Sequence, residues 1–118
     1  MVRGIRGAIT VKANSESEII NATKKLLMEM LKTNELIYDD IVSIFFSATN
    51  DLNKAFPAKA ARMLGLKLVP LFCCQEMNVE GSLKRCIRVL IHVNTDKKPD
   101  QIRHVYLEEA KNLRPDLD

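Results

Sequence analysis

Residues 84–93, KRCIRVLIHV, alternate between two kinds of side chain, and this alternation constrains the fold more than any other stretch of the chain. In a β-strand, side chains two positions apart lie on the same face. One face would carry only apolar side chains, those of Ile87, Val89, Ile91 and Val93. The other face would carry Cys86, Arg88, Leu90 and His92. The pattern predicts a strand with its first face against a helix and with Arg88 on the second face, where the charge needs water or an anion.

Three further segments predict strands, namely residues 2–11, 40–49 and 67–77. Pro70 lies inside the third segment, and because proline cannot donate a ladder hydrogen bond, it indicates an edge strand or a bulge. The segment 104–112 is ambiguous, because HVYLE alternates like a strand whereas helix formers follow it. A fifth strand is therefore one of two interpretations of the C-terminal segment.

Two helices are expected between these strands. Ser15, with Glu18 three positions later, forms a capping-box pattern at the start of a long helix over residues 15–34. Its apolar residues recur at helical spacing and are Ile19, Ala22, Leu26, Leu27, Met30 and Leu31. A short helix begins at Pro57 and ends at Gly65. The order of elements predicts an α+β fold with helices on one sheet face, in a single domain over residues 1–118.

Composition excludes several classes of function. The net charge of +3 favours anions only weakly and lacks the basic stripe of a nucleic-acid binder. No apolar run is long enough to span a bilayer, and the N-terminus has no signal-peptide pattern, so no membrane partner is expected. The three cysteines are odd in number, which suits reduced thiols. We expect a cytoplasmic protein.

No metal or cofactor is expected either. His92 and His104 share no ligand spacing, and no Cys-x-x-Cys motif occurs. No serine elbow or Cys/His pair indicates nucleophilic catalysis. Among the polar residues, Arg6 lies between Gly4 and Ala8, and these small neighbours leave room for a ligand. Taken one at a time, however, the polar residues are most simply surface or packing residues.

Seven blocks of sequence together resemble one family. They are RGIRGA at 3–8, SATNDL at 47–52, FPAKAAR at 56–62, VPLFCCQEM at 69–77, LKRCIRV at 83–89, QIRHVYLE at 101–108 and LRPDL at 113–117. In this order they are similar to the monofunctional chorismate mutases of the small trimeric bacterial class, the AroH class. The resemblance extends over almost the whole chain.

The resemblance implies a five-stranded mixed sheet with one long and one short helix, a chorismate mutase-like fold related to ferredoxin-like folds. It implies a homotrimer that forms a pseudo α/β barrel, with active sites between neighbouring subunits. It also favours a strand around residues 104–112. The implied enzyme is an isomerase that rearranges chorismate to prephenate, in the shikimate-pathway branch to phenylalanine and tyrosine.

The implied reaction is pericyclic, so it transfers no proton and needs no nucleophile, metal or cofactor. The protein must hold a flexible dianion in a compact chair-like conformer and stabilise charge on the breaking ether bond. By resemblance, Arg88 would contact the ether oxygen and Glu76 the ring hydroxyl. Arg6 and Tyr106 would bind carboxylates. Cys73, three positions before the glutamate, would contact the hydroxyl end of the ring.

Further site residues follow from the same resemblance. The adjacent subunit would supply an apolar wall and an anion-attracting entrance from Phe56, Ala58, Lys59 and Arg62. Leu113 and Arg114 would belong to a mobile tail that closes over the substrate. Phe72 is bulkier than the family pattern, but by alternation it should face away from Cys73.

Three alternatives remain open from the sequence. Rid-type imine deaminases are trimers of similar fold with an arginine in a cleft between subunits, although the CIRV, QEM and FPAKAAR blocks argue against them. A non-catalytic trimer that binds an anionic metabolite would use the same charged residues. A nucleic-acid binder is the weakest alternative, because the chain has no aromatic–basic platform.

Overall fold

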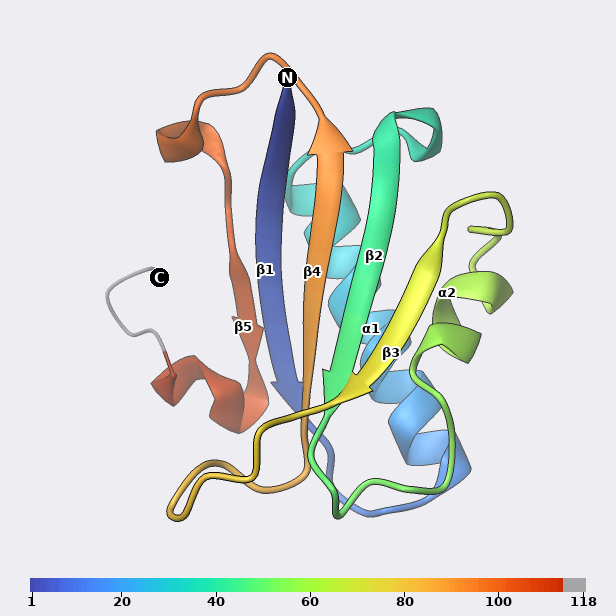
Figure 1. Ribbon diagram of the computed structural model, residues 1–118, viewed down its shortest axis with the longest axis vertical. Coiled ribbons are helices and arrows are strands. Elements are labelled where there is room, and N and C mark those ends of the chain that lie inside the picture. Colours follow the sequence, from blue (N-terminus) through green and yellow to red (C-terminus); the bar gives the residue numbers. More distant parts are fainter. Residues whose placement is uncertain (114–118) are drawn as a thin grey trace.

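Five strands form one mixed sheet in the order β3-β2-β4-β1-β5. The structure is a computed structural model that describes residues 1–113. The strands are β1 (Val2–Thr10), β2 (Ile41–Ala48), β3 (Leu71–Gln75), β4 (Cys86–Asn94) and β5 (Val105–Leu107). The central strand β4 is antiparallel to β1 and β2, while β3 is parallel to β2 and β5 is parallel to β1 (Figure 1). The predicted α+β fold with a five-stranded mixed sheet is confirmed.

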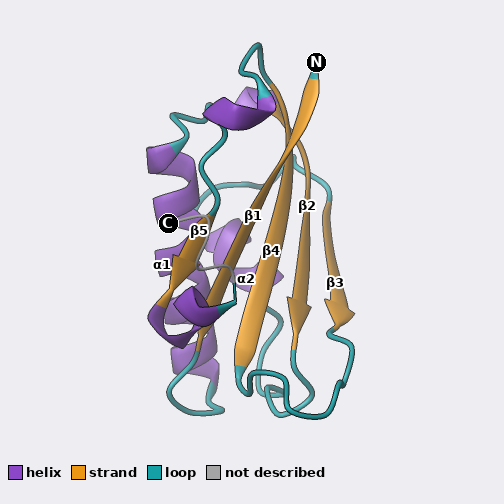
Figure 2. Cartoon of the chain, turned by 90° about the vertical axis from the view of Figure 1, so that its left-hand side faces the viewer, coloured by secondary structure: helices purple, strands orange, loops and turns teal. Residues whose placement is uncertain are grey.

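Two α-helices, α1 (Glu16–Thr33) and α2 (Ala58–Met63), cover one face of this sheet (Figure 2). The Ser15 hydroxyl accepts a hydrogen bond of 3.2 Å from the Glu18 backbone N–H, so the predicted N-cap is confirmed. Three short 3₁₀ helices connect the elements: η1 (Tyr38–Asp40), η2 (Pro99–Gln101) and η3 (Glu108–Asn112). None of the helices in the described part of the chain is long and apolar enough to cross a membrane.

The alternation of β4 decides where the core lies. The four apolar residues predicted for one face, Ile87, Val89, Ile91 and Val93, are all buried. They belong to one buried cluster with Leu26, Leu27 and Met30 of α1. Each such side chain stabilises the fold by about 1.5–3 kcal/mol relative to an exposed one. Within the described residues, the opposite face, which we call the open face, carries no α-helix, although Ala110 of η3 packs against Ala8 and Cys86 at one corner.

The prediction of a strand over residues 104–112 is wrong beyond Leu107, where β5 ends. Glu108 has φ of 55°, in the left-handed region that ends a strand, and the EEAKN segment then forms η3. Alanine, lysine and glutamate also have low strand propensity. The Lys25 ammonium holds the turn through a 2.7 Å ion pair with Glu108, which lowers the pKa of that carboxyl.

The third and fourth strands are confirmed with shorter bounds. β3 begins directly after Pro70 and lies at the edge of the sheet, as the proline predicted. β4 begins at Cys86 because Arg85, with φ of 47°, is outside extended geometry.

We expect Gly7→Ala to destabilise the protein. A methyl group at Gly7 would overlap the Met30 sulfur, where β1 lies under α1. Overpacking of this kind costs about 1–3 kcal/mol of unfolding free energy, measurable by urea denaturation. Gly4→Ala is the matched control, because its methyl would meet Leu90 at an ordinary 3.4 Å. Equal stability of the two variants would contradict the close approach at Gly7.

Candidate active site

A hollow of about 290 Å³ lies on the open face, and residues from all five strands line it. Its polar lining comes from Arg6 of β1, Ser47 of β2, Cys74 of β3, Arg88 of β4 and Tyr106 of β5. Strand register brings these residues together, because Arg88 is opposite Ala8 on one side and Ser47 on the other. Tyr106 is opposite Ala8 in turn. The structure thus gathers three of the predicted site residues, Arg6, Arg88 and Tyr106, around one hollow.

Glu76 is held against Arg88 at the rim of this hollow. The Arg88 Nε–H donates to Glu76 Oε2 at 2.9 Å, and the Ser47 hydroxyl donates to the same oxygen at 2.8 Å. The Glu76 backbone N–H donates to the Ala48 carbonyl at 2.9 Å, which fixes the residue just beyond the end of β3. The Arg88 side chain is 47% exposed, so solvent still reaches its charge.

Arg6 is the second cation beside the hollow. Its side chain is exposed and makes no hydrogen bond or ion pair with another residue of 1–113. Its backbone N–H donates to His104 Nδ1 at 2.9 Å, which ties β1 to the segment before β5. Two guanidinium groups and one carboxylate give the open face a net positive charge. Guanidinium groups bind carboxylates well because their donors form a planar fork.

Cys73 lies on the other side of the sheet from Arg88, since neighbouring residues of a strand point to opposite faces. Its thiol lies beside α2, and burial raises the pKa of Cys73 while the Ala58 backbone and the Arg62 charge partly offset that rise. The neighbouring Cys74 lines the hollow on the open face and donates to the Phe46 carbonyl at 3.4 Å, and it also lines part of the second hollow described below. Within one chain, therefore, Cys73 cannot share a ligand with Arg88.

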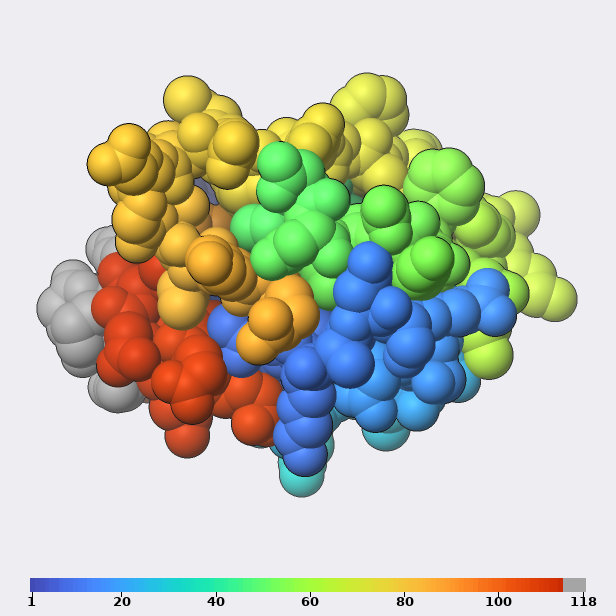
Figure 3. All heavy atoms as spheres, turned by 90° about the horizontal axis from the view of Figure 1, so that it is seen from below, coloured from blue at the N-terminus to red at the C-terminus, as the bar shows by residue number. Residues whose placement is uncertain are grey.

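A second hollow, of about 680 Å³, contains Cys73 together with Phe56 and Lys59. Phe56 is 71% exposed, whereas the Ala58 side chain is buried in the core of its own chain. Arg62 is exposed on α2. Figure 3 looks onto the end of the molecule where β2 and β3 finish, and it shows the loop after β2 (green) beside the start of α1 (blue). The predicted site residues thus form two groups on different sides of the chain.

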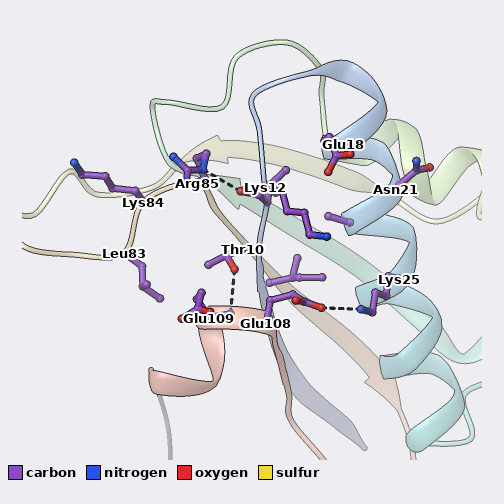
Figure 4. A pocket seen from close by; sticks show the side chains of 13 residues that line it. Thr10, Lys12, Glu18, Asn21, Lys25, Leu83, Lys84, Arg85, Glu108 and Glu109 are labelled. Carbon is purple, nitrogen blue, oxygen red and sulfur yellow. Dashed lines mark hydrogen bonds and ion pairs between the residues drawn. The ribbon is translucent and has the colours of Figure 1, made fainter.

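A third hollow, also of about 680 Å³, lies between α1, the end of β1 and η3 (Figure 4). Its charged side chains are of both signs, and all of them except the half-buried Glu18 are exposed. Lys25 is paired with Glu108 at 2.7 Å, and the Thr10 hydroxyl accepts from the Glu109 backbone N–H at 3.1 Å. None of the predicted site residues lines it, so its size alone does not make it a candidate. Leu113 instead packs with Ala8 and Cys86 beside the first hollow, and Arg114 lies outside the described residues.

Two residues that position β4, Thr49 and Asp51, lie in the SATNDL block, but the sequence did not predict this role for them. Both Asp51 carboxylate oxygens accept from the Arg85 backbone N–H, at 3.1 and 3.0 Å, and Thr49 donates to one of them. Thr49 Oγ1 in turn accepts from the Cys86 backbone N–H at 3.0 Å. The network fixes the start of β4, two residues before Arg88. Cys86 is buried there, and burial raises the pKa of its thiol, partly offset by the adjacent Arg88.

No group of three or more histidine, cysteine, aspartate or glutamate residues within 1–113 is arranged to hold a metal ion. On the open face, Arg6 and Arg88 can recognise and stabilise negative charge, with Glu76 and Tyr106 as hydrogen-bonding groups.

Comparison with known proteins gives consistent matches. The family model described as chorismate mutase type I matches residues 2–117. The chain is 53% identical to chorismate mutase AroH of Bacillus subtilis (strain 168), over 99% of this chain and 93% of that protein. It is 51% identical to chorismate mutase AroH of Thermus thermophilus, over 100% of this chain and 98% of that protein. A solved structure of a chorismate mutase from Clostridium thermocellum has 53% identity and a TM-score of 0.92, over 93% of this chain and 98% of that chain.

We expect Asp51→Ala to destabilise the protein and to lower its activity, because the start of β4 loses its anchor. Asp51 is a charged acceptor for the Arg85 backbone N–H and the Thr49 hydroxyl, and hydrogen bonds to a charged group contribute about 1.5–3 kcal/mol. Asp51→Asn keeps one acceptor oxygen and should lose less. Thermal denaturation measures the effect, and Lys54→Ala, at an exposed position of the same loop, is the control. Equal melting temperatures for Asp51→Ala and the control would show that the network is dispensable.

Proposed function

The chain belongs to the chorismate mutase type I family, and from that premise we propose that it rearranges chorismate to prephenate against the open face of its sheet. The enzyme is an isomerase of the shikimate-pathway branch to aromatic amino acids. One domain over residues 1–118 would carry the activity. The observation that supports this site best is the Arg88–Glu76 pair, held at 2.9 Å beside a hollow that a second cation, Arg6, also lines.

The reaction breaks an ether bond while a carbon–carbon bond forms, and it needs no proton transfer. Negative charge grows on the ether oxygen as the bond breaks. In our proposal the Arg88 guanidinium meets this oxygen, where it stabilises the transition state more than the bound substrate. That difference is the condition for raising kcat. Because the guanidinium is already held by Glu76, little reorganisation is needed when the charge develops.

The other polar residues at the hollow would orient the substrate. Arg6, whose guanidinium is free within residues 1–113, would bind one substrate carboxylate in a two-pronged contact. Tyr106 would donate its hydroxyl to a carboxylate, and Glu76 would accept from the ring hydroxyl. Holding the two reacting carbons in the chair-like conformer removes much of the entropic part of the barrier.

A homotrimer would complete this site. Arg6, Arg88 and Tyr106 lie on the open face, whereas Cys73, Phe56 and Lys59 line a hollow beside α2. These groups lie on opposite faces of the sheet, and a neighbouring subunit could bring its second group to the first. Arg62 of the neighbour would add positive charge at the entrance.

Apolar side chains on the open face support association. Phe72 is 61% exposed and packs edge-on against Phe45 at a centroid distance of 6.1 Å. Phe45 also packs against His92 at 5.5 Å. Exposed aromatic groups of this kind indicate a surface that another protein covers. As predicted, Phe72 points away from Cys73. The three free thiols support a reducing, cytoplasmic environment.

We expect the purified protein to consume chorismate, followed by the loss of its ultraviolet absorbance. Arg88→citrulline, which keeps the shape and removes the charge, should lower kcat by at least about a hundredfold while a bicyclic diacid analogue still binds. Arg88→Lys should retain part of the rate. Arg3→Gln is the control, since Arg3 donates to the Lys97 carbonyl on the opposite face.

Lack of turnover by the parent protein would contradict the assignment. Release of ammonia from an imine-generating system would then support the Rid-type alternative, and analogue binding without turnover the metabolite-binding trimer.

The shared site predicts complementation between two inactive variants. Arg88→Ala damages the open-face group, and Lys59→Glu/Arg62→Glu damages the group beside α2. Random assembly of the two variants into trimers would restore about a quarter of the parental activity. An intact site needs one particular variant on each of its two sides, and each side has about an even chance of carrying it. The variants are mixed after brief denaturation and assayed on chorismate. Mixtures that stay inactive, although mixed trimers are seen by mass spectrometry, would contradict a site between subunits.

A further inference from the structure

Ser47 lies at the centre of the charged group on the open face. It is opposite Arg88 on β4 and opposite Cys74 on β3, so neighbours on both sides fix its backbone. Its hydroxyl donates to Glu76 Oε2 at 2.8 Å, and Arg88 Nε–H donates to the same oxygen at 2.9 Å. No role for this serine followed from the sequence.

We propose that Ser47 is a positioning residue for the chorismate rearrangement: its hydroxyl fixes the Glu76 carboxylate and, through it, the orientation of the Arg88 guanidinium. This inference rests on the proposed function. Ser47 itself need not touch the reacting atoms.

Glu76 needs such support because of its place in the chain. It follows the last residue of β3, and its main chain is held by one 2.9 Å hydrogen bond to Ala48. Its side chain has three rotatable bonds, and ordering such a side chain costs up to about 2 kcal/mol. Without Ser47, the strongest remaining contact of the carboxylate would be Arg88, whose side chain is itself 47% exposed. A flexible carboxylate, 23% exposed, and a flexible guanidinium, 47% exposed, would then orient only each other.

Serine is suited to the task because it is the most rigid member of the group. Its side chain has one rotatable carbon–carbon bond, and β2 is an interior strand bonded to both β3 and β4. A hydroxyl that donates to a carboxylate forms a strong, charge-assisted hydrogen bond. Ser47 thereby fixes the position of Glu76 Oε2 relative to the sheet.

The geometry also determines which donors of Arg88 stay available. Arg88 contacts Glu76 through its Nε–H. The acceptor is Glu76 Oε2, the same oxygen that accepts from the Ser47 hydroxyl. A fork-to-fork pair would occupy two guanidinium donors and both carboxylate oxygens. Among residues 1–113, Glu76 Oε1 has only a long, 3.3 Å contact, from the Met77 backbone N–H. That oxygen can accept from a ring hydroxyl while terminal N–H groups of Arg88 remain for the ether oxygen.

The test compares Ser47→Ala with Ser43→Ala. Ser43 is on the same strand and face, four residues away, and its hydroxyl contacts His92 Nδ1 at 3.2 Å, outside the charged group. We expect Ser47→Ala to lower kcat by about tenfold to a hundredfold with little change in KM, because a hydrogen bond to a charged group is lost. Ser43→Ala should stay within about twofold of the parent protein, and both variants should keep similar melting temperatures.

Two further readouts separate positioning from a merely structural role. If Ser47 acts through Glu76, Ser47→Ala should have little additional effect in a Glu76→Gln background, whereas independent effects would multiply. In arginine-labelled protein, the Nε–Hε resonance of Arg88 should shift in Ser47→Ala and not in Ser43→Ala. Ser47→Thr, which retains a hydroxyl, should recover most of kcat.

The outcomes distinguish this inference from the proposed function. An active parent protein whose Ser47→Ala variant matches Ser43→Ala in kcat and in the Arg88 resonance would overturn the positioning role alone. Multiplicative effects of Ser47→Ala and Glu76→Gln would overturn it as well. A parent protein that does not consume chorismate would overturn the proposed function, and the positioning role with it.

Discussion

The register of β4 between β1 and β2 is the constraint on which the rest of the structure depends. In this register Arg88 is opposite Ala8 and Ser47, and Arg6 is opposite Leu90, all on the open face. A slip by one residue would exchange the two faces of the strand. It would bury an arginine against α1 and expose four apolar residues, so the same pattern that stabilises the core also fixes the site. The Thr49–Asp51 network holds this register where β4 begins.

Local patterns predicted most of the fold because the interactions behind them are local. The Ser15 cap joins residues three apart, and the alternation of β4 follows from strand geometry alone. Prediction failed where the secondary structure of a short segment was ambiguous from its own residues. The EEAKN segment has weak strand propensity, and the left-handed Glu108 ends the strand before it; Glu108 also pairs with the exposed Lys25, 83 residues away in sequence.

The candidate site was less predictable than the fold. Arg88 and Glu76 were identified through their resemblance to a family, and nothing in composition or spacing indicates that they pair. Their contact depends on the loop between β3 and β4 and on Ser47 from a third strand. Cys73 and Cys74 are adjacent, so the side of the sheet that each thiol faces depends on the register between β3 and β2, which no local pattern in the sequence sets.

The half-exposed Arg88 links association to catalysis. In water, a cation near a developing negative charge gains about 1 kcal/mol at 4 Å, whereas the gain is several-fold larger at the lower effective dielectric of a covered site. With 47% of its side chain exposed in one chain, Arg88 is in the first situation. A neighbouring subunit that brings an apolar wall over the hollow would exclude water and strengthen the contact with the ether oxygen. Subunit association would then raise kcat directly, because an isolated subunit would bind an anion yet stabilise the transition state poorly.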